Sequence, residues 1–208
     1  MKNLVSFYSG WIEEASQLAV LITEFCPGES LAAIFQNKCA KKQSFSEKGI
    51  LDIANGILKG LHFLHKNKMF HGNLTMNNVL FDELGAPKLS DFGIVQLWQE
   101  KKLPEMQRVK SEQENQFASE EKRKYDIHSL GLILYKLCLL DDFFPESYEN
   151  QVSNLNNCNM KNQFFLQIPN MLNSNFKLRP DSNSLLNCCS KVLLELHINQ
   201  VLYSILSN

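Results

Sequence analysis

The stretch HGNLTMNNVLF, residues 71 to 81, gathers polar side chains directly before a short apolar run. It contains one histidine, His71, and three asparagines. The asparagine at position 73 limits the chemistry of this stretch, because a carboxamide has no basic lone pair at neutral pH and cannot act as a general base. The stretch therefore contains no carboxylate that could act as a general base.

A carboxylate follows ten residues later in the segment KLSDFG. Asp91 in this segment and the amide of Asn78 both present hard oxygen atoms, which are the ligands that magnesium prefers. An aspartate before a glycine also commonly caps a turn. Metal binding and turn capping are therefore both open for Asp91.

The histidines have simple structural interpretations. We favour a hydrogen-bonded core histidine over a catalytic role for His71. The other four lie scattered in helical contexts without the spacing of metal ligands, and they are His62, His65, His128 and His197.

Composition and charge exclude several classes of function. With 208 residues, of which 44% are hydrophobic, the chain is long enough for one globular domain. The formal net charge of -1 gives no field that would attract nucleic acid or an acidic membrane. The six cysteines form no C-x-x-C pattern, so we expect reduced thiols, no metal cluster, and a cytoplasmic or else nuclear location. The longest apolar run, residues 130–140, has about half the length needed to cross a bilayer.

The first half of the chain predicts a hairpin followed by a helix. Residues 4–11 and 18–25 are rich in branched and aromatic side chains, which indicates two antiparallel strands. From Ser44 onward the apolar residues recur every three to four positions, as on an amphipathic helix. Ser44 and Glu47 have the S-x-x-E spacing of a helix cap.

The second half predicts a smaller hairpin and further helices. VLF and PKLS flank the turn DELGA. Residues 99–124 are polar and predict a long, mobile surface loop, whereas residues 125–140 predict a central helix that is apolar on nearly all sides. FFLQIPNML is the one clear anchor within residues 141–175. In the final helix, 182–206, we expect these residues to be buried: Leu185, Leu186, Val192, Leu193, Leu196, Val201, Leu202 and Ile205.

Six segments, taken in order, resemble the landmarks of the protein kinase superfamily: VLITEFCPGESL, HGNLTMNNVLF, KLSDFG, FASEE, YDIHSLG and KLRPD. The resemblance runs from about residue 4 to residue 186. A second likeness, in FYSGW and LAVLITEFCPGESL, is to the kinase-like end of a tudor-containing germ-cell protein.

The kinase resemblance implies a role for several residues. TEFC resembles the hinge, with Thr23 at the gatekeeper position and the main chain of Glu24 and Cys26 facing an adenine edge. Leu80 would form the floor beneath the base. Asn78 and Asp91 match the two magnesium-binding positions.

The same resemblance shows where the chain departs from the family pattern. Asn73 occupies the position of the aspartate that accepts the substrate proton, a role that typically contributes ~10² to 10⁴-fold to the rate. Thr75 replaces a lysine, and Gly72 replaces an arginine. The chain opens on what resembles the family's fourth strand, so the glycine-rich loop and the phosphate-holding lysine and glutamate are not seen. QENQFASEE retains little of the substrate-binding segment.

Other matches concern folding. The resemblance pairs Glu120 with Arg179 as a buried ion pair and makes Asp126 the tether of the catalytic-loop backbone. His71 and Phe92 match positions of an internal hydrophobic column.

These observations predict an α+β fold, mainly α, that resembles a kinase C-terminal lobe with a truncated N-terminal lobe. We expect one partial domain, with two remnant strands and the hinge in residues 1–26 and a helical lobe in residues 27–208. The predicted function is a pseudokinase-type interaction or regulatory module that is not an active enzyme. Its partners would be proteins, or a larger parent chain that supplies the N-terminal lobe, and neither nucleic acid nor membrane. Binding of ATP and Mg²⁺ would be weak and not required.

Two alternatives are open. The chain is a shortened form of a serine/threonine kinase, which the presence of Asn78 and Asp91 favours. Otherwise it has no independent function, because the open edge of the hairpin and an apolar hinge side would need a partner or a further segment to cover them.

Overall fold

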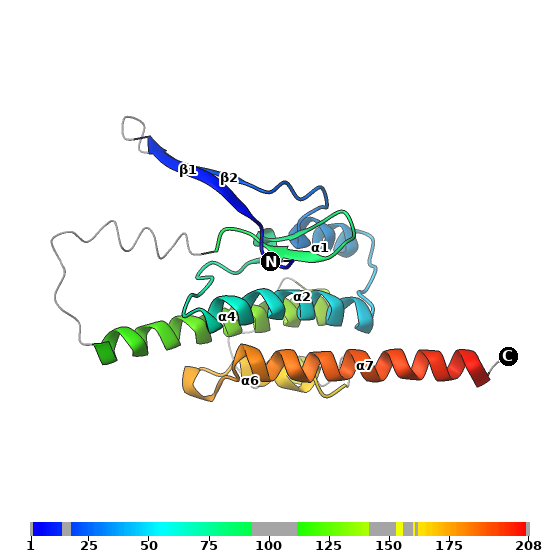
Figure 1. Ribbon diagram of the computed structural model, residues 1–208. Helices are drawn as coiled ribbons and strands as arrows, with labels where there is room; N and C mark the ends of the chain where they lie inside the picture. Colours follow the sequence, from blue (N-terminus) through cyan, green and yellow to red (C-terminus); the bar gives the residue numbers. More distant parts are fainter. Residues whose placement is uncertain are drawn as a thin grey trace.

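The molecule is mainly helical and has two small two-stranded sheets, which confirms the predicted fold class (Figure 1). The computed structural model describes residues 2–13, 18–92, 112–141, 153–155, 160 and 162–206, and the side chains of 12, 19, 112–118, 205 and 206 are outside this description. The strands are β1 (Phe7–Glu13), β2 (Leu18–Thr23), β3 (Val79–Phe81) and β4 (Pro87–Leu89). The helices are α1 (Leu31–Ala40), α2 (Glu47–Lys66), α4 (Glu112–Leu139), α6 (Ile168–Met171) and α7 (Ser182–Leu206). Short 3-10 turns cover Met76–Asn78, Phe165–Gln167 and Phe176–Leu178.

The predicted N-terminal hairpin is confirmed. β1 and β2 pair antiparallel from Phe7 opposite Thr23 to Glu13 opposite Leu18, and the pair projects from the helical body (Figure 1). Its large apolar side chains are exposed: Phe7, Tyr8, Trp11, Leu18, Leu21 and Ile22. A two-stranded hairpin is only marginally stable by itself. The apolar surface expected on this side of the molecule is therefore present.

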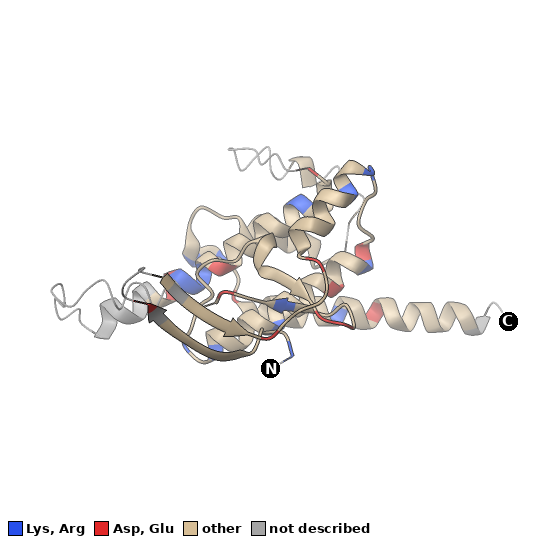
Figure 2. Ribbon diagram, turned by 90° about the horizontal axis from the view of Figure 1, so that it is seen from above, with Lys and Arg blue, Asp and Glu red and all other residues tan. Residues whose placement is uncertain are grey.

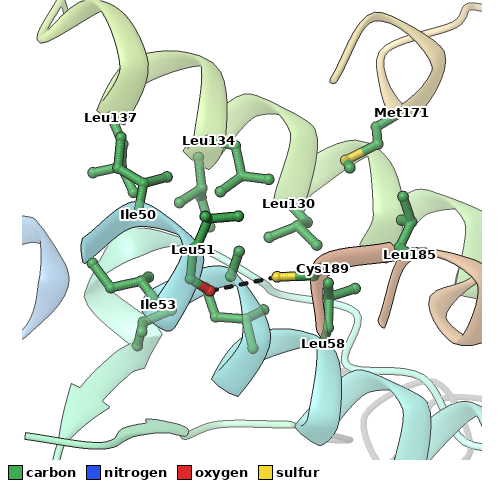
Figure 3. Packing of buried hydrophobic residues seen from close by; sticks show 14 of the residues in the cluster. Ile50, Leu51, Ile53, Leu58, Leu130, Leu134, Leu137, Met171, Leu185 and Cys189 are labelled. Carbon is green, nitrogen blue, oxygen red and sulfur yellow. Dashed lines mark hydrogen bonds between the residues drawn. The ribbon is translucent and has the colours of Figure 1, made fainter. Parts of the chain in front are cut away.

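Helix α2 is the centre of the core. Its apolar residues recur every three to four positions and are almost fully buried, as the sequence predicts. Helices α4 and α7 pack against it and α6 packs against α4, and Figure 3 shows Leu51 of α2 in one cluster with Leu130 of α4 and Cys189 of α7. The Cys189 thiol donates to the main-chain oxygen of Leu51 at 3.5 Å. This core fixes α2 against α4, and the loop carrying His71 lies just beyond the end of α2.

The start of α2 differs from the prediction. The N-cap is Ser46, whose Oγ accepts a hydrogen bond from the main-chain nitrogen of Gly49 at 3.1 Å, so the predicted capping pair of Ser44 and Glu47 is wrong. The cap belongs to the serine with extended backbone immediately before the first helical residue. The preceding helix α1 was not predicted, although Ser30 caps it in the same way.

The segment predicted as a long polar loop is partly helical. Residues 99–111 lie outside the described residues, but 112–124 form the first turns of α4. Glutamate, glutamine, lysine and arginine are good helix formers, so polarity alone did not indicate a loop. The second part of α4 is the predicted buried central helix, with Ile127, Leu130 and Leu134 fully buried.

The small sheet binds the N-terminal segment to α2. β3 and β4 pair antiparallel, as predicted, and Leu4 forms a parallel bridge with Leu89. Leu89 accepts from the main chain of Val5 at 2.9 Å and donates to that of Asn3 at 3.0 Å. These bonds attach the segment before β1 to β4, the strand that ends just before Asp91.

Helix α7 extends past the core. Leu185, Cys189 and Val192 are buried, whereas Val201 and Leu202 are 44% and 50% exposed, so the predicted burial of these two is wrong. Figure 2 shows that the last turns carry no Lys, Arg, Asp or Glu. Among the described residues, no helix is both long enough and apolar enough to cross a membrane.

Candidate functional site

The loop after α2 is held by one buried carboxylate. Asp126 of α4 accepts hydrogen bonds from the main-chain nitrogens of His71 at 2.8 Å and Gly72 at 2.9 Å. Gly72 has a φ of 78°, a conformation that favours glycine. The tethering role predicted for Asp126 is therefore present in the geometry.

His65 extends the contacts of Asp126 to α7. The sequence had predicted only a structural or surface role for this histidine. The Nε2 of His65 lies 2.9 Å from Asp126 Oδ2, and its Nδ1 lies 3.1 Å from Oγ of Ser182 at the start of α7. Asp126, His65 and Ser182 are nearly inaccessible to solvent. Although the residue types match a hydrolytic triad, burial makes this arrangement a structural link between α2, α4 and α7.

Asn73 and Asn78 lie on the two sides of the loop. Asn73 is exposed, and its main-chain oxygen accepts from the Nδ2 of Asn78 at 2.9 Å. The main-chain oxygen of Asn78 accepts in turn from the nitrogen of Ser90 at 2.9 Å. These bonds use the side-chain nitrogen and the main-chain oxygen of Asn78. The side-chain oxygen is therefore the atom of Asn78 that could coordinate a cation.

Asp91 follows Ser90 directly and is exposed, with a left-handed φ of 57°. Residues that the structure describes form no hydrogen bond to its carboxylate, unlike Asp82, whose Oδ1 accepts from Leu84 and Ala86 in the β3–β4 turn. The turn-capping interpretation therefore fits Asp82 better than Asp91. The hydrogen bond between Ser90 and Asn78 places both predicted magnesium ligands at the same end of the small sheet.

His71 is fully buried beneath this loop. Its Nδ1 accepts from the main-chain nitrogen of Asn73 at 3.3 Å, but its Nε2 has no partner among the described residues. Burial lowers the pKa of His71, and the nearby carboxylates of Asp126 and Asp91 oppose this effect. The prediction of a satisfied core histidine is thus met at one nitrogen only. Phe92 packs against the same core.

The hinge residues connect the hairpin to the body. The main-chain nitrogen of Glu24 donates to Ser6 at 2.8 Å, and that of Gly28 donates to Phe81 at 3.0 Å. The main-chain nitrogen of Cys26 makes no main-chain hydrogen bond within the described residues, and the side chain of Leu80 is half-buried. The predicted contacts of the Glu24 and Cys26 main chain with an adenine edge therefore stay a prediction.

A lysine that the sequence analysis did not single out holds the hinge glutamate. Lys88 of β4, almost fully buried, pairs with the Glu24 carboxylate, whose other oxygen accepts from the Ser6 nitrogen at 3.0 Å. The Lys88 hydrogen bond, followed by that of Ser6, lowers the pKa of Glu24 from 4.5 to about 2. Lys88 could have been identified from the sequence, because it stands between apolar residues of a predicted strand and a buried lysine needs a partner of opposite charge.

The predicted ion pair of Glu120 and Arg179 is wrong. Glu120 is exposed, and in the described part of the chain Arg179 forms no ion pair with it. Arg179 instead donates to the main-chain oxygens of Asn173 at 2.8 Å and Lys124 at 3.2 Å. Glu121, one position further along α4, contributes the favourable charge that opposes the lowering of the Arg179 pKa by burial. The arginine therefore joins the late turns to α4 through the main chain.

Comparison with known proteins gives one family and several relatives. A sequence model described as "Protein kinase domain" matches residues 1–197. The chain is 33% identical over 91 residues to the MAP kinase kinase MKK1/SSP32 of Saccharomyces cerevisiae, which is 44% of this chain and 18% of the relative. It is 38% identical over 87 residues to the serine/threonine-protein kinase dst3 of Dictyostelium discoideum, covering 42% of this chain and 15% of dst3.

A third relative matches a similar share of this chain. The serine/threonine-protein kinase CLA4 of Candida albicans is 37% identical over 92 residues, which is 44% of this chain and 9% of CLA4. The matched segment thus spans less than a fifth of each of these three relatives. The second resemblance, to a tudor-containing protein, gains no support from these relatives.

Proposed function

Because the chain belongs to the protein kinase domain family, as its sequence resemblance predicted, we propose that it is a pseudokinase-type module that binds or regulates other proteins. The observation that carries this proposal is the exposed carboxamide of Asn73 at the position of the proton-accepting aspartate. The loop around it is held by Asp126 and Asn78. A well-positioned loop that presents no base keeps the shape of a catalytic site and loses its proton acceptor.

The charges near Asn73 support the same proposal. Between His71 and Phe81 there is no lysine or arginine, since Gly72 and Thr75 stand where the family has basic residues. Phosphoryl transfer depends largely on positive groups that stabilise the charge of the transferred phosphate. With these groups replaced, the loop can orient a ligand but lacks its own means of stabilising that charge.

The family generally uses ATP with Mg²⁺, which would supply a transferable phosphoryl group. The described residues fit this ligand in part. The Asn78 side-chain oxygen and the Asp91 carboxylate suit magnesium, and the Cys26 N–H and the Glu24 carbonyl suit an adenine edge above Leu80. We propose that nucleotide binding is weak and that the module does not require it.

A phosphotransfer assay tests the proposal. Purified protein, radiolabelled ATP with Mg²⁺ and a general substrate such as myelin basic protein should give no labelling above that of the matched Asp91→Ala variant. Labelling that persists unchanged in Asp91→Ala identifies a contaminating kinase. Labelling by the wild type that Asp91→Ala abolishes would refute the proposal.

A shortened serine/threonine kinase is the second candidate, favoured by Asn78 and Asp91. It predicts that the coding sequence upstream of Met1 contains a glycine-rich loop and a strand lysine. A parent chain with both elements and with Asp91-dependent turnover would establish this candidate. A parent chain without them would remove it.

A further inference from the structure

Helix α7 has two apolar faces that point in opposite directions. One face packs on the core, where Leu185, Cys189 and Val192 are buried. A residue two positions further along a helix lies about 200° around its axis, so Leu194 points away from the side on which Val192 is buried. Leu194 is accordingly 59% exposed. A second apolar face therefore begins at Leu194, on the side of α7 opposite the core.

This second face continues along the helix. Ile198, Val201 and Leu202 follow Leu194 at steps of four, seven and eight residues, which is the spacing of a single helix face. They are 46%, 44% and 50% exposed. We call these four residues the outer stripe.

The outer stripe begins where the outward side of α7 stops being polar. Asn183, Asn187 and Ser190 lie on the same side of the helix, one to three turns before the stripe, and all three are exposed. A surface helix normally carries polar residues opposite its core face, and α7 follows this rule only before the stripe. Three of the four stripe residues also follow residue 197, where the match to the kinase family ends. The stripe is therefore not explained by the family fold.

The charges around the outer stripe favour a second copy of this chain over a different protein as its partner. Helices of unlike chains are usually matched by charged residues that flank the apolar seam. Residues 196–206 contain no Lys, Arg, Asp or Glu, as the last turns of α7 show in Figure 2. The stripe thus has no charge that would select another protein or repel its own copy. The formal net charge of -1 gives little repulsion between two molecules.

The size of the outer stripe sets the strength of such a contact. Its residues span about 12 Å of helix, and packed helices lie about 8 to 10 Å apart. Two facing stripes therefore bury less than the ~800 Å² per partner of a standard interface, which is typical of weak, reversible association. Because the same patch is used on both molecules, the contact is closed at two copies.

We propose that the outer stripe is a self-association surface, through which α7 of one molecule packs against α7 of a second copy. Ile198 lies at the centre of the contact, between Leu194 on one side and Val201 and Leu202 on the other. This part of α7 extends past the core, so a second helix can approach it without meeting the helical body (Figure 1). The inference goes beyond the proposed function, and neither depends on the other.

Sedimentation equilibrium of the purified chain tests the inference without nucleotide, at concentrations from about 2 to about 200 µM. We expect a reversible equilibrium between monomer and dimer, with a dissociation constant of roughly 10 to 100 µM. A chain that is still monomeric at about 200 µM would overturn the inference.

Three variants locate the contact. Ile198→Glu places a charge at the centre of the stripe and should raise the dissociation constant at least tenfold. Asn187→Glu adds the same charge on the same side of the same helix, before the stripe begins, and should dimerise as the wild type does. Ile198→Leu keeps the apolar surface and should stay within about threefold of the wild type. Thermal melting confirms that each variant is folded.

The exposed hairpin is the competing surface for self-association. Trp11→Ser removes its exposed tryptophan and leaves α7 unchanged, so this variant should dimerise as the wild type does. Association that survives in folded Ile198→Glu, or that Trp11→Ser abolishes, would place the contact elsewhere and overturn the inference.

Hydrogen exchange followed by mass spectrometry gives a second measurement on the unmodified chain. Raising the concentration from about 2 to about 200 µM should slow the exchange of main-chain amides in residues 194–206 and leave residues 183–191 unchanged. Equal exchange of residues 194–206 at both concentrations would contradict the proposed contact.

Discussion

At the scale of single residues, Asp126 joins three parts of the molecule. Its two oxygens accept from the loop nitrogens of His71 and Gly72, and one of them also meets His65, which reaches Ser182 on α7. The position of the loop therefore depends on α4 more than on the loop's own sequence.

We predict that Asp126→Ala destabilises the protein by about 3 to 5 kcal/mol, because two buried main-chain donors and His65 lose their partner. Urea denaturation followed by circular dichroism measures the effect. Asp52→Ala is the control, since Asp52 pairs with Lys48 at the surface, where both side chains are about half exposed, and should change stability by no more than about 1 kcal/mol. A loss of under about 1 kcal/mol for Asp126→Ala would contradict the tether.

Glu24 gives a prediction about pH. Its pKa falls from 4.5 to about 2 on folding, chiefly through Lys88, so the paired carboxylate stabilises the folded state above pH 4.5 and this stabilisation is lost as the pH falls toward 2. The melting temperature of the wild type should therefore drop more steeply between pH 4.5 and 2 than that of Glu24→Gln. Glu83→Gln, at an exposed turn position, should follow the wild type. Parallel curves for wild type and Glu24→Gln would rule out the proposed coupling.

Residue roles were predictable from sequence only where position along the chain determines them. The tethering role of Asp126 was predictable because its motif resembles a landmark of the family, whereas the roles of Asn73 and Asn78 stay predictions. Lys88 was missed because its partner Glu24 lies 64 residues away, and only the folded chain brings the two together. The pair of Glu120 and Arg179 was wrong because a one-residue difference along α4 turns a side chain to solvent.

At the scale of elements, α2 approaches β4 through glycines. A Cβ at position 56 would lie 2.1 Å from Cγ of Pro87, and one at position 60 would lie 2.8 Å from Cδ1 of Leu89. These contacts allow the helix to lie directly on the strand that leads to Asp91. The separation of helix and strand is therefore set by the absence of side chains at two positions.

We predict that Gly56→Ala destabilises the protein by about 1 to 3 kcal/mol, because the added methyl group overpacks the interface with β4. Gly49→Ala is the matched control in the same helix. A Cβ there would meet the Ser46 hydroxyl at 3.0 Å but no atom of β4, so Gly49→Ala should cost less stability than Gly56→Ala. Thermal or urea unfolding of both variants measures the difference. Equal stability of the two would show that helix and strand separate easily.

The elements were predictable to the extent that burial follows periodicity. The buried faces of α2 and of the second half of α4 follow from their apolar residues, and the two hairpins follow from branched residues around turns. The first turns of α4 and the helix α1 were missed because polar or short segments have no strong period, and their helical form depends on neighbours and caps. The burial predicted for Val201 and Leu202 was wrong because the sequence does not show where the core ends along α7.

At the scale of the whole molecule, a helical body carries a projecting hairpin (Figure 1). The body has its own core, whereas the hairpin exposes Phe7, Tyr8 and Trp11 at 53 to 66%. The Glu24 carboxylate, through Lys88 and the Ser6 nitrogen, ties the hinge between them to β4 and to the base of the hairpin. The division at residue 26 that the sequence suggests stays a prediction.

This arrangement sets how tightly the hinge side can hold a nucleotide. Under the proposed function, the hinge main chain and Leu80 would contact a base, and Asn78 and Asp91 would hold a magnesium ion. Residues 71–81 contain no lysine or arginine that could hold the phosphates. Most of the charge of Mg-ATP would therefore face water. We expect a dissociation constant of about 1 mM or weaker, which at 1 mM Mg-ATP adds at most about 0.4 kcal/mol.

Thermal melting with and without 1 mM Mg-ATP measures this directly. For a chain of this size, 0.4 kcal/mol corresponds to a rise of about 1 to 2 °C, whereas a site filled at ~100 times its dissociation constant would add about 2.7 kcal/mol and raise the midpoint by about 5 to 11 °C. Asp91→Ala, which removes the exposed carboxylate without touching the core, separates metal-dependent binding from nonspecific effects of the salt. A rise above about 5 °C that Asp91→Ala abolishes would mean that the loop between His71 and Phe81 holds the phosphates through main-chain groups, and that the missing lysine is not what limits binding.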